Sequence, residues 1–294
     1  MRRIDVRDGI RLAVEVHGEG EPLVLIMGIG AQLVFWPADL IQGLVRQGFQ
    51  VITFDNRDCG ESTWLDGVPT PQPLSTMTRA LAGLSVPAPY TLWDMADDTV
   101  HLLDALGHDT AHVAGISLGG MVAQCVAIKH PTRVRSLASM HSTTGSRRHS
   151  IGDPRAYAAL LSKRPQTRDE AGETLVRFYQ KVGSTGFQHD WDEVRDRGRL
   201  AFDRGSNPAG FLRQWAAIMA TGARDEALRK LDVPTVVVHG AVDRLIPTRA
   251  GRHTARCIRD ARLEVIEGLG HDLPPGVRGR IVQHLAWNAG RASS

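Results

Sequence analysis

Cysteine is scarce in this sequence, and long apolar runs are lacking. The three cysteines, Cys59, Cys125 and Cys257, are scattered and form no C-x-x-C pair, so neither a disulfide framework nor a metal site of the usual zinc type is expected. The longest apolar stretch, residues 23–36, is interrupted by two glycines and a glutamine. Spanning a bilayer takes roughly 20 apolar residues, and so no membrane-spanning helix is expected.

An excess of charge of one sign is also lacking. The 35 basic and 32 acidic residues leave a net charge of +3, and the basic residues form no long run, so a nucleic-acid partner is not expected. The N-terminal region carries Asp5, Arg7, Asp8 and Glu15 where a signal peptide needs a continuous apolar segment. This predicts a cytoplasmic protein. The oligomeric state is left open by the sequence.

Short apolar runs alternate with helical patterns along most of the chain, and 42% of its 294 residues are hydrophobic. Residues 2–7 and 10–16 alternate apolar with polar around Asp8-Gly9, which predicts an antiparallel hairpin. The later alternation of strands and helices predicts a mostly parallel sheet with helices on both faces, an α/β fold. The expected strands are residues 22–27, 50–55, 111–116, 134–140, 233–239 and 263–266, and the expected helices are residues 36–47, 91–106, 119–129, 248–259 and 277–287.

Two segments interrupt this alternation. Residues 65–90 contain five prolines, and a connection of this length is usually functional, so we expect a flap over the site. Residues 145–230 lack an apolar strand run but carry several amphipathic helical patterns. We therefore expect a core of residues 1–144 and 231–294, with a helical cap of residues 145–230 inserted in it.

The strongest motif is Gly115-Ile116-Ser117-Leu118-Gly119, between an expected strand and an expected helix. G-x-S-x-G in this setting predicts a nucleophile elbow, a turn so tight that the serine adopts strained backbone angles and its neighbours lack bulk. The N-terminus of the following helix presents N–H groups to a developing negative charge. A tight turn with a structural serine is the alternative.

A serine nucleophile needs an adjacent base, and the base needs an orienting acid. Asp243 follows the expected strand 233–239, and His271 follows the expected strand 263–266. Both side chains would lie at the carboxyl ends of parallel strands, where loops converge on one site. The order Ser, Asp, His is typical of hydrolases with a nucleophile elbow.

Three other residues compete for these roles. His239 stands at a strand end but precedes the acid, and we interpret it as a buried strand residue. His141 follows the strand before the cap, where some hydrolases carry the acid. Asp272 adjoins His271, yet side chains of neighbouring residues seldom face each other across a loop.

The oxyanion formed in such a reaction needs two backbone N–H donors. Leu118, directly after the serine, is one predicted donor. The second is Ile29, in the glycine-containing loop 27–30 after an early strand. Gly28 gives this loop the backbone freedom to turn the amide inward.

Two nearby patterns have other interpretations. The glycines of loop 27–30 could begin a dinucleotide-binding fingerprint with Asp55 as its acid, but Leu33 replaces the third glycine. The polar turn of residues 55–62 is interpreted as joining loops beneath the site rather than acting on substrate. Cys59 within it is not a credible nucleophile, because no histidine follows in a suitable order.

Taken together, these residues resemble the α/β-hydrolase superfamily over about residues 4–287, and they are similar to a bacterial branch containing the aclacinomycin methylesterases and related carboxylesterases and lactonases. The stretches that match are residues 55–62, 115–119 and 270–274 and the loop around Asp243. The resemblance implies a cofactor-free ester hydrolase with Ser117 as nucleophile, His271 as base and Asp243 as orienter. Met27 departs from the pattern, since most relatives carry histidine there.

The implied substrate is a small-molecule ester or lactone, bound without a metal in an apolar pocket under the cap. Ester hydrolysis through an acyl-enzyme, on small to medium apolar acyl groups, is the expected reaction. A lactonase acting for example on acyl-homoserine lactones, a cofactor-free perhydrolase or haloperoxidase, and a non-enzymatic ligand-binding module are the alternatives. Each cap aromatic alone is an ordinary helix-core residue, but together they suggest the pocket, whose predicted residues are Met27, Gly28, Trp64, Trp191 and Trp215.

Overall fold

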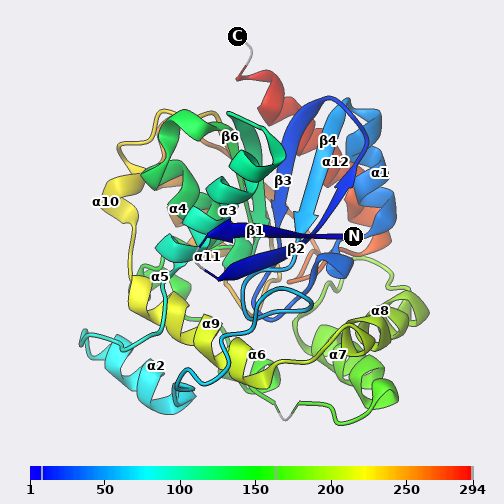
Figure 1. Ribbon diagram of the computed structural model, residues 1–294, viewed down its shortest axis with the longest axis vertical. Helices are drawn as coiled ribbons and strands as arrows, with labels where there is room; N and C mark the ends of the chain where they lie inside the picture. The colour runs from blue at the N-terminus through cyan, green and yellow to red at the C-terminus, as the bar shows by residue number, and fades with distance from the viewer. Residues whose placement is uncertain (8, 163, 293–294) are drawn as a thin grey trace.

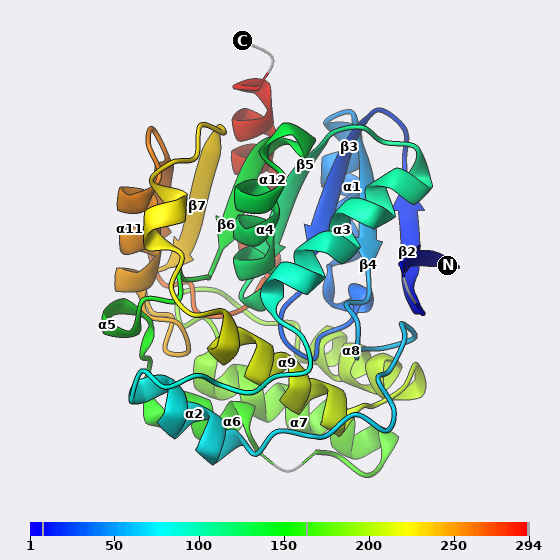
Figure 2. The ribbon, with the colours of Figure 1, turned by 60° about the vertical axis from the view of Figure 1, so that its left-hand side comes forward.

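The computed structural model describes residues 1–7, 9–162 and 164–292, in which eight strands form one sheet with helices on both faces (Figures 1 and 2). The strand order across the sheet is β1-β2-β4-β3-β5-β6-β7-β8. The strands are β1 (Arg2–Arg7), β2 (Ile10–His17), β3 (Glu21–Ile26), β4 (Phe49–Phe54), β5 (Ala111–Ile116), β6 (Val134–Met140), β7 (Thr235–Gly240) and β8 (Arg262–Ile266).

An antiparallel hairpin opens the chain, as predicted. Strands β1 and β2 pair antiparallel, and the positive φ of +72° at Gly9 lies in their turn; the other predicted turn residue, Asp8, lies outside the described residues. Strand β2 then pairs antiparallel with β4. From β4 to β8 every pairing is parallel, which confirms the predicted mostly parallel sheet.

Helices cover the two faces of the sheet and bury two apolar clusters. On one face, α3 (Leu92–Leu106), α4 (Leu118–Lys129) and α11 (Thr248–Cys257) contribute side chains such as Leu102 and Val122 to the larger cluster. On the other face, α1 (Ala38–Arg46) and α12 (Pro275–Gly290) contribute Leu44 and Ile281 to the second cluster. A sheet buried on both faces explains why its central strands read as continuous apolar runs. Throughout the described ranges, each helix is either too short or too polar to cross a lipid bilayer.

Prolines account for the main differences from the predicted boundaries. Strand β7 begins at Thr235 rather than at residue 233, because the preceding Pro234 has no N–H for a strand ladder. Helix α1 begins after Pro37, and a short 3-10 helix, η1 (Leu33–Phe35), precedes it. Within the proline-rich segment, α2 (Pro73–Leu81) was not predicted. Its Pro73 occupies the first helical turn, where the missing N–H would have no partner in any case.

Six helices lie between β6 and β7 in the described chain, in the segment predicted to be a cap. Helices α6 to α9 gather beyond the carboxyl ends of the parallel strands, in the lower part of Figure 2, where α7 and α8 pack side by side and α2 packs against α9. The short η2 (Pro131–Arg133) precedes β6. The six helices are α5 (Arg147–Ser150), α6 (Pro154–Leu160), α7 (Arg168–Val182), α8 (Trp191–Asp203), α9 (Pro208–Thr221) and α10 (Asp225–Leu228).

Two buried ion pairs attach these helices to the loop that follows β4. Arg204, which ends α8, places Nη2 2.5 Å from Asp55 Oδ2. Arg213 of α9 donates to both carboxylate oxygens of Asp58, at 2.6 and 2.8 Å. Because a buried charge without its partner is costly, each pair strongly favours the docked position of its helix.

We predict that Arg213→Met lowers the free energy of unfolding by about 3–5 kcal/mol. The Asp58 side chain is fully buried, and the substitution would leave its carboxylate without the bidentate partner. Chemical denaturation at neutral pH measures the difference. The control is Arg168→Met, which removes a pair whose side chains are 56% and 46% exposed and should change stability little; similar losses in the two variants would contradict the assignment.

Candidate active site

Ser117 joins β5 to α4 in a strained turn. Its backbone angles are φ +58° and ψ −121°, a conformation that L residues rarely adopt. The turn projects the serine beyond the end of the strand, while Ser142 Oγ donates to the Ser117 carbonyl oxygen at 2.7 Å. A strained serine between a strand and a helix has the geometry predicted for a nucleophile elbow.

Three glycines make this turn possible. A Cβ at Gly115 would overlap the backbone of Gly119 across the turn, and a Cβ at Gly119 would overlap the carbonyl oxygen of Ile26 at the end of β3. A Cβ at Gly28 would stand 3.3 Å from Ser117 Cβ. The helix, two strand ends and the loop after β3 therefore meet at Ser117 with no room for side chains between them.

Asp243 and His271 form a hydrogen-bonded pair at the carboxyl ends of β7 and β8. His271 Nδ1 lies 2.7 Å from Asp243 Oδ2. The other carboxylate oxygen, Oδ1, accepts the backbone N–H groups of Leu245 and Ile246, both at 2.9 Å. Burial opposes ionisation of Asp243, but the charge of His271 and the hydrogen bonds from His271 and His141 hold the pKa of the carboxyl well below its usual range. The acid is therefore a fixed anion behind His271.

Two further histidines surround the same carboxylate. His141, fully buried with φ +46°, places Nδ1 3.3 Å from Asp243 Oδ2. His239 Nε2 lies 3.6 Å from the same oxygen. The same nitrogen is hydrogen-bonded to the Ile246 carbonyl oxygen at 2.8 Å. Burial lowers the pKa of His239 to about 4, so it is neutral at neutral pH. The sequence offered His141 and His239 as competing candidates, and in the structure both histidines contact the Asp243 carboxylate.

Asp272 faces away from the neighbouring histidine. Its Oδ1 accepts the backbone N–H of Ser184 at 3.0 Å and the Ser184 hydroxyl at 2.6 Å. Its Oδ2 lies 2.6 Å from His189 Nε2. The carboxylate thus joins the loop before α8 to the loop that carries His271, and it is not placed to orient His271 Nδ1.

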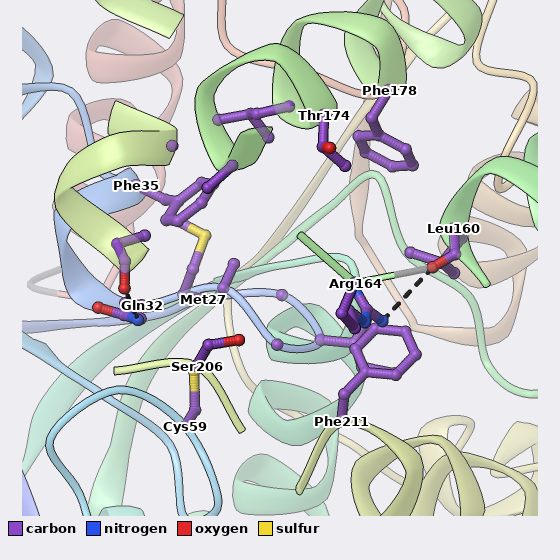
Figure 3. Close-up of a pocket in the computed structure, with 18 of the residues that line it drawn as sticks. Met27, Gln32, Phe35, Cys59, Leu160, Arg164, Thr174, Phe178, Ser206 and Phe211 are labelled. Atoms are coloured by element: carbon purple, nitrogen blue, oxygen red, sulfur yellow. Dashed lines mark hydrogen bonds between the residues drawn. The ribbon is translucent and has the colours of Figure 1, made fainter. Parts of the chain in front are cut away.

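A cavity of about 250 Å³ opens onto Ser117 and His271. Its walls are mostly apolar and come from the loop after β3, from helices α6 to α9 and from the connections between them (Figure 3). Of the described residues, those of the proline-rich segment 65–90 do not line it. The large apolar side chains in its walls include Met27, Phe35, Leu160, Leu175, Phe178, Phe202 and Phe211.

The predicted pocket residues divide into two groups. Met27 and Gly28 line the cavity. The other three, Trp64, Trp191 and Trp215, lie outside the cavity wall. Trp64 Nε1 donates to the Gly60 carbonyl at 2.9 Å, and the Trp191 ring stacks on a histidine ring with centroids 4.4 Å apart. Trp215 is buried in the packing of α9, where it is 3% exposed. Phenylalanines of the same helices take their place in the cavity wall.

In the part of the chain that the structure describes, the Ile29 amide, in the loop after β3, is free to bind a substrate atom in the cavity that contains Ser117. The N–H of Gly30 donates to Gln214 Oε1 at 2.8 Å, and that of Ala31 donates to the Gly28 carbonyl at 3.2 Å. In the described residues the Ile29 N–H has no acceptor. The Leu118 N–H is in the first turn of α4, where a helix provides no acceptor. These are the two amides predicted to hold an oxyanion.

The dinucleotide and cysteine alternatives meet structural obstacles. Asp55 accepts the Leu33 N–H at 2.6 Å and pairs with Arg204, so it is not available to a ribose. Burial raises the pKa of the Cys59 thiol well above its usual range. The polar turn instead joins loops and helices around the site, which is the role expected from its sequence.

Among the residues that the structure describes, two groups of side chains have donor atoms close enough to hold a metal ion, within 4.8 Å of one another. One is His141, Asp243 and His271, whose donors already bond to each other. The second is Asp225, His253 and Cys257, on α10 and α11, where His253 Nε2 lies 3.2 Å from the Asp225 carboxylate and 3.6 Å from the thiol. The packing of α10 against α11 brings this second group together, and no sequence motif predicted it.

Comparison with known proteins places the chain in a family. A family model for the alpha/beta hydrolase fold matches residues 21–274. Rhodomycin D methylesterase from Streptomyces peucetius is 27% identical, over 94% of this chain and 93% of that protein. A putative non-heme haloperoxidase from Mycobacterium phage D29 is 27% identical, over 90% of this chain and 86% of that protein.

A solved structure agrees in fold. A meta-cleavage product hydrolase from Pseudomonas fluorescens superposes with a TM-score of 0.75 at 20% identity, over 99% of this chain and 98% of that one. This chain belongs to the α/β-hydrolase fold family. The resemblance to bacterial methylesterases expected from the motifs is confirmed, since rhodomycin D methylesterases from two Streptomyces sources are among the similar proteins.

We predict that His239 makes the protein less stable as the pH falls from about 6.5 to about 4. Burial lowers the folded-state pKa of His239 to about 4, whereas an unfolded chain binds the same proton near pH 6.5. Between these values the unfolded state holds a proton that the folded state lacks, so the free energy of unfolding falls by up to about 1.4 kcal/mol per pH unit.

Urea denaturation at a series of pH values measures this slope. His239→Gln retains an amide donor for the Ile246 carbonyl but does not titrate. For this variant, the free energy of unfolding should depend less steeply on pH between about pH 6.5 and pH 4. The difference in slope from the wild type should correspond to at most about one bound proton. Equal slopes would show that His239 does not carry the effect.

Proposed function

We propose that the protein is a serine hydrolase that cleaves carboxylic esters through an acyl-enzyme. The observation that carries this proposal is that Ser117 and His271 meet at one cavity, with Asp243 bonded to His271. Ser117, at a strained elbow, and His271 both line this cavity. His271 Nδ1 lies 2.7 Å from Oδ2 of the buried Asp243 carboxylate. Ester-cleaving names among the similar proteins support the same reaction class.

The first half of the reaction forms the acyl-enzyme. Ser117 Oγ attacks the ester carbonyl carbon while His271 Nε2 accepts the hydroxyl proton. The Asp243 carboxylate stabilises the imidazolium and holds its Nδ1–H in place. The carbonyl oxygen becomes an oxyanion that accepts the N–H groups of Ile29 and Leu118. When the C–O bond to the alcohol breaks, the proton on His271 passes to the leaving oxygen.

The second half returns the enzyme. A water molecule gives its proton to His271 Nε2 and attacks the acyl carbon, and the proton then passes to Ser117 Oγ as the acid leaves. Each step balances in protons and electron pairs with this chain's own residues.

Residues 145–230 form a cap on a core of residues 1–144 and 231–294 in this proposal. Helices α6 to α9 and their connections supply much of the cavity wall, including Phe178 and Phe211. The buried pairs of Arg204 and Arg213 with the loop after β4 fix part of this cap on the core. Closing the cavity over the substrate would exclude water other than the attacking molecule.

The apolar walls favour an acyl group of small to medium size. Burying apolar surface supplies binding energy in proportion to the area covered, and this cavity offers phenylalanine and leucine side chains over most of its length. Lactone opening and perhydrolysis would use the same serine, histidine and oxyanion donors, and so substrate comparison distinguishes them.

We predict a stoichiometric burst of p-nitrophenol when the protein meets p-nitrophenyl esters, and none with Ser117→Ala. The burst reports one acyl group transferred per serine before slow hydrolysis. Stopped-flow absorbance on esters of graded chain length, beside a panel of acyl lactones, also locates the preferred acyl size and ring-opening activity.

The control for the serine is Ser206→Ala, because Ser206 also lines the cavity without a role in the mechanism. Its burst should match that of the wild type. A burst that survives Ser117→Ala, or one that Ser206→Ala removes, would contradict Ser117 as the nucleophile.

We predict that Asp243→Asn reduces kcat by about 10⁴-fold, since the amide favours the wrong tautomer of His271. Asp272→Asn changes the carboxylate of the residue that follows His271 in the chain. That carboxylate bonds to Ser184 and His189. This substitution should leave kcat within about tenfold of the wild type once folding is verified by thermal denaturation. Steady-state kinetics on one activated ester measures both, and the reverse order of effects would assign the acid to Asp272.

A further inference from the structure

Arg164 lies in the wall of the cavity that contains Ser117 and His271. It belongs to the connection between α6 and α7. Its guanidinium carbon stands 3.7 Å from the centroid of the Phe211 ring, and Nη2 donates to the Leu160 carbonyl at 3.5 Å (Figure 3). Stacking on an aromatic face and one carbonyl acceptor satisfy only part of a group with five N–H donors.

This arginine has no carboxylate partner in the part of the chain that the structure describes. Burial alone acts on it and lowers its pKa to about 10, which still leaves it cationic at neutral pH. Most other arginines of α7 to α9 pair with a carboxylate, whereas Arg177 of α7 donates to the Thr174 hydroxyl instead. Those paired arginines are Arg168, Arg195, Arg197, Arg199 and Arg213.

The remaining charges around the cavity do not neutralise Arg164. Asp58 also lines it, but that carboxylate is held by Arg213 at 2.6 and 2.8 Å and by the Tyr90 hydroxyl at 2.9 Å. Asn207 also lines the cavity, and its Nδ2 is buried without an acceptor in the described residues. The cavity thus combines apolar walls with a cation that has no carboxylate partner in the described residues.

Phe211 relates this cation to the reacting centre. One face of its ring carries the guanidinium, and its Cδ2 would stand 2.7 Å from a Cβ placed on Gly30, in the proposed oxyanion loop. The guanidinium is therefore about one aromatic ring away from the loop that would hold the ester carbonyl. A substrate of a few carbons reaches from one to the other.

We propose that Arg164 binds a carboxylate carried by the substrate, so that this site prefers esters with a negative charge a few carbons from the scissile carbonyl. The planar guanidinium fork fits a carboxylate in a bidentate manner. A half-buried cation without a counter-ion is costly, and a substrate carboxylate would remove that cost. This inference rests on the proposed ester hydrolysis at Ser117.

Binding of two ketones that cannot be hydrolysed tests the anion site without turnover. The pair is 5-oxohexanoate and 5-oxohexanamide, which differ only in a carboxylate or its neutral amide. The wild type should bind the carboxylate at least about tenfold more tightly, as expected for a hydrogen-bonded charge pair. Arg164→Gln should bind both ketones alike. Ligand-observed NMR titrations give the four dissociation constants.

Hydrolysis supplies the second readout. The p-nitrophenyl monoester of glutaric acid is compared with the p-nitrophenyl ester of its monoamide. The wild type should show a kcat/KM about 10- to 100-fold higher for the anionic ester. In Arg164→Gln the ratio of the two kcat/KM values should fall to about one. The matched control is Arg148→Gln, at an exposed arginine of α5 outside the cavity.

Two results would overturn the proposal. One is equal binding of the two ketones by the wild type, and the other is an anion preference that Arg164→Gln retains. Arg164 would then serve only to pack on Phe211. Failure of the proposed function is distinct: neither ester would be hydrolysed through Ser117, while the ketone titrations would still report on the anion site.

Discussion

Close backbone packing around Ser117 is the constraint on which the rest of the site depends. The serine is held at φ +58°, a costly conformation that persists only where surrounding structure determines it. Here β5, α4 and the loop after β3 meet without intervening side chains, because Gly115, Gly119 and Gly28 leave room for backbone alone. The proposed nucleophile and the two proposed oxyanion donors, the amides of Ile29 and Leu118, all belong to the segments that meet at this junction.

Charge pairing places the other wall of the site. Asp55 and Asp58 lie in the turn after β4 as buried carboxyl groups, and each is matched by an arginine from the segment between β6 and β7. Gln214 extends this connection, because it accepts the Gly30 N–H and donates to the Arg57 carbonyl, both at 2.8 Å. Arg164 differs from these arginines, because it has no carboxylate partner in the described residues, and we propose that a ligand offsets the cost of its buried charge.

Local patterns predicted the tight turn at Ser117 and the strand ends that carry Asp243 and His271, and tertiary contacts explain what they did not predict. Ser117 follows from a five-residue motif, and the paired ends of β7 and β8 follow from the rule that parallel strands end at one edge. The cavity walls depend on which side of α7, α8 and α9 faces inward. Amphipathic periodicity identifies the apolar face of a helix but not the segment against which that face packs. The sequence therefore predicted Trp215 in the pocket, whereas Phe211 of the same helix lines it. The approach of His141 to Asp243 likewise depends on β6 lying beside β7.

The central claim is that Ser117 is an activated nucleophile, and covalent labelling tests it most directly. The protein is treated with an alkyl fluorophosphonate, and the adduct is located by intact-mass and peptide mass spectrometry. The account predicts one phosphonyl group per chain on the peptide containing Ser117, with loss of labelling in Ser117→Ala and strong slowing in His271→Ala, because the hydroxyl reacts only when a base removes its proton. Complete absence of an adduct on Ser117, or an adduct on another residue, would contradict it.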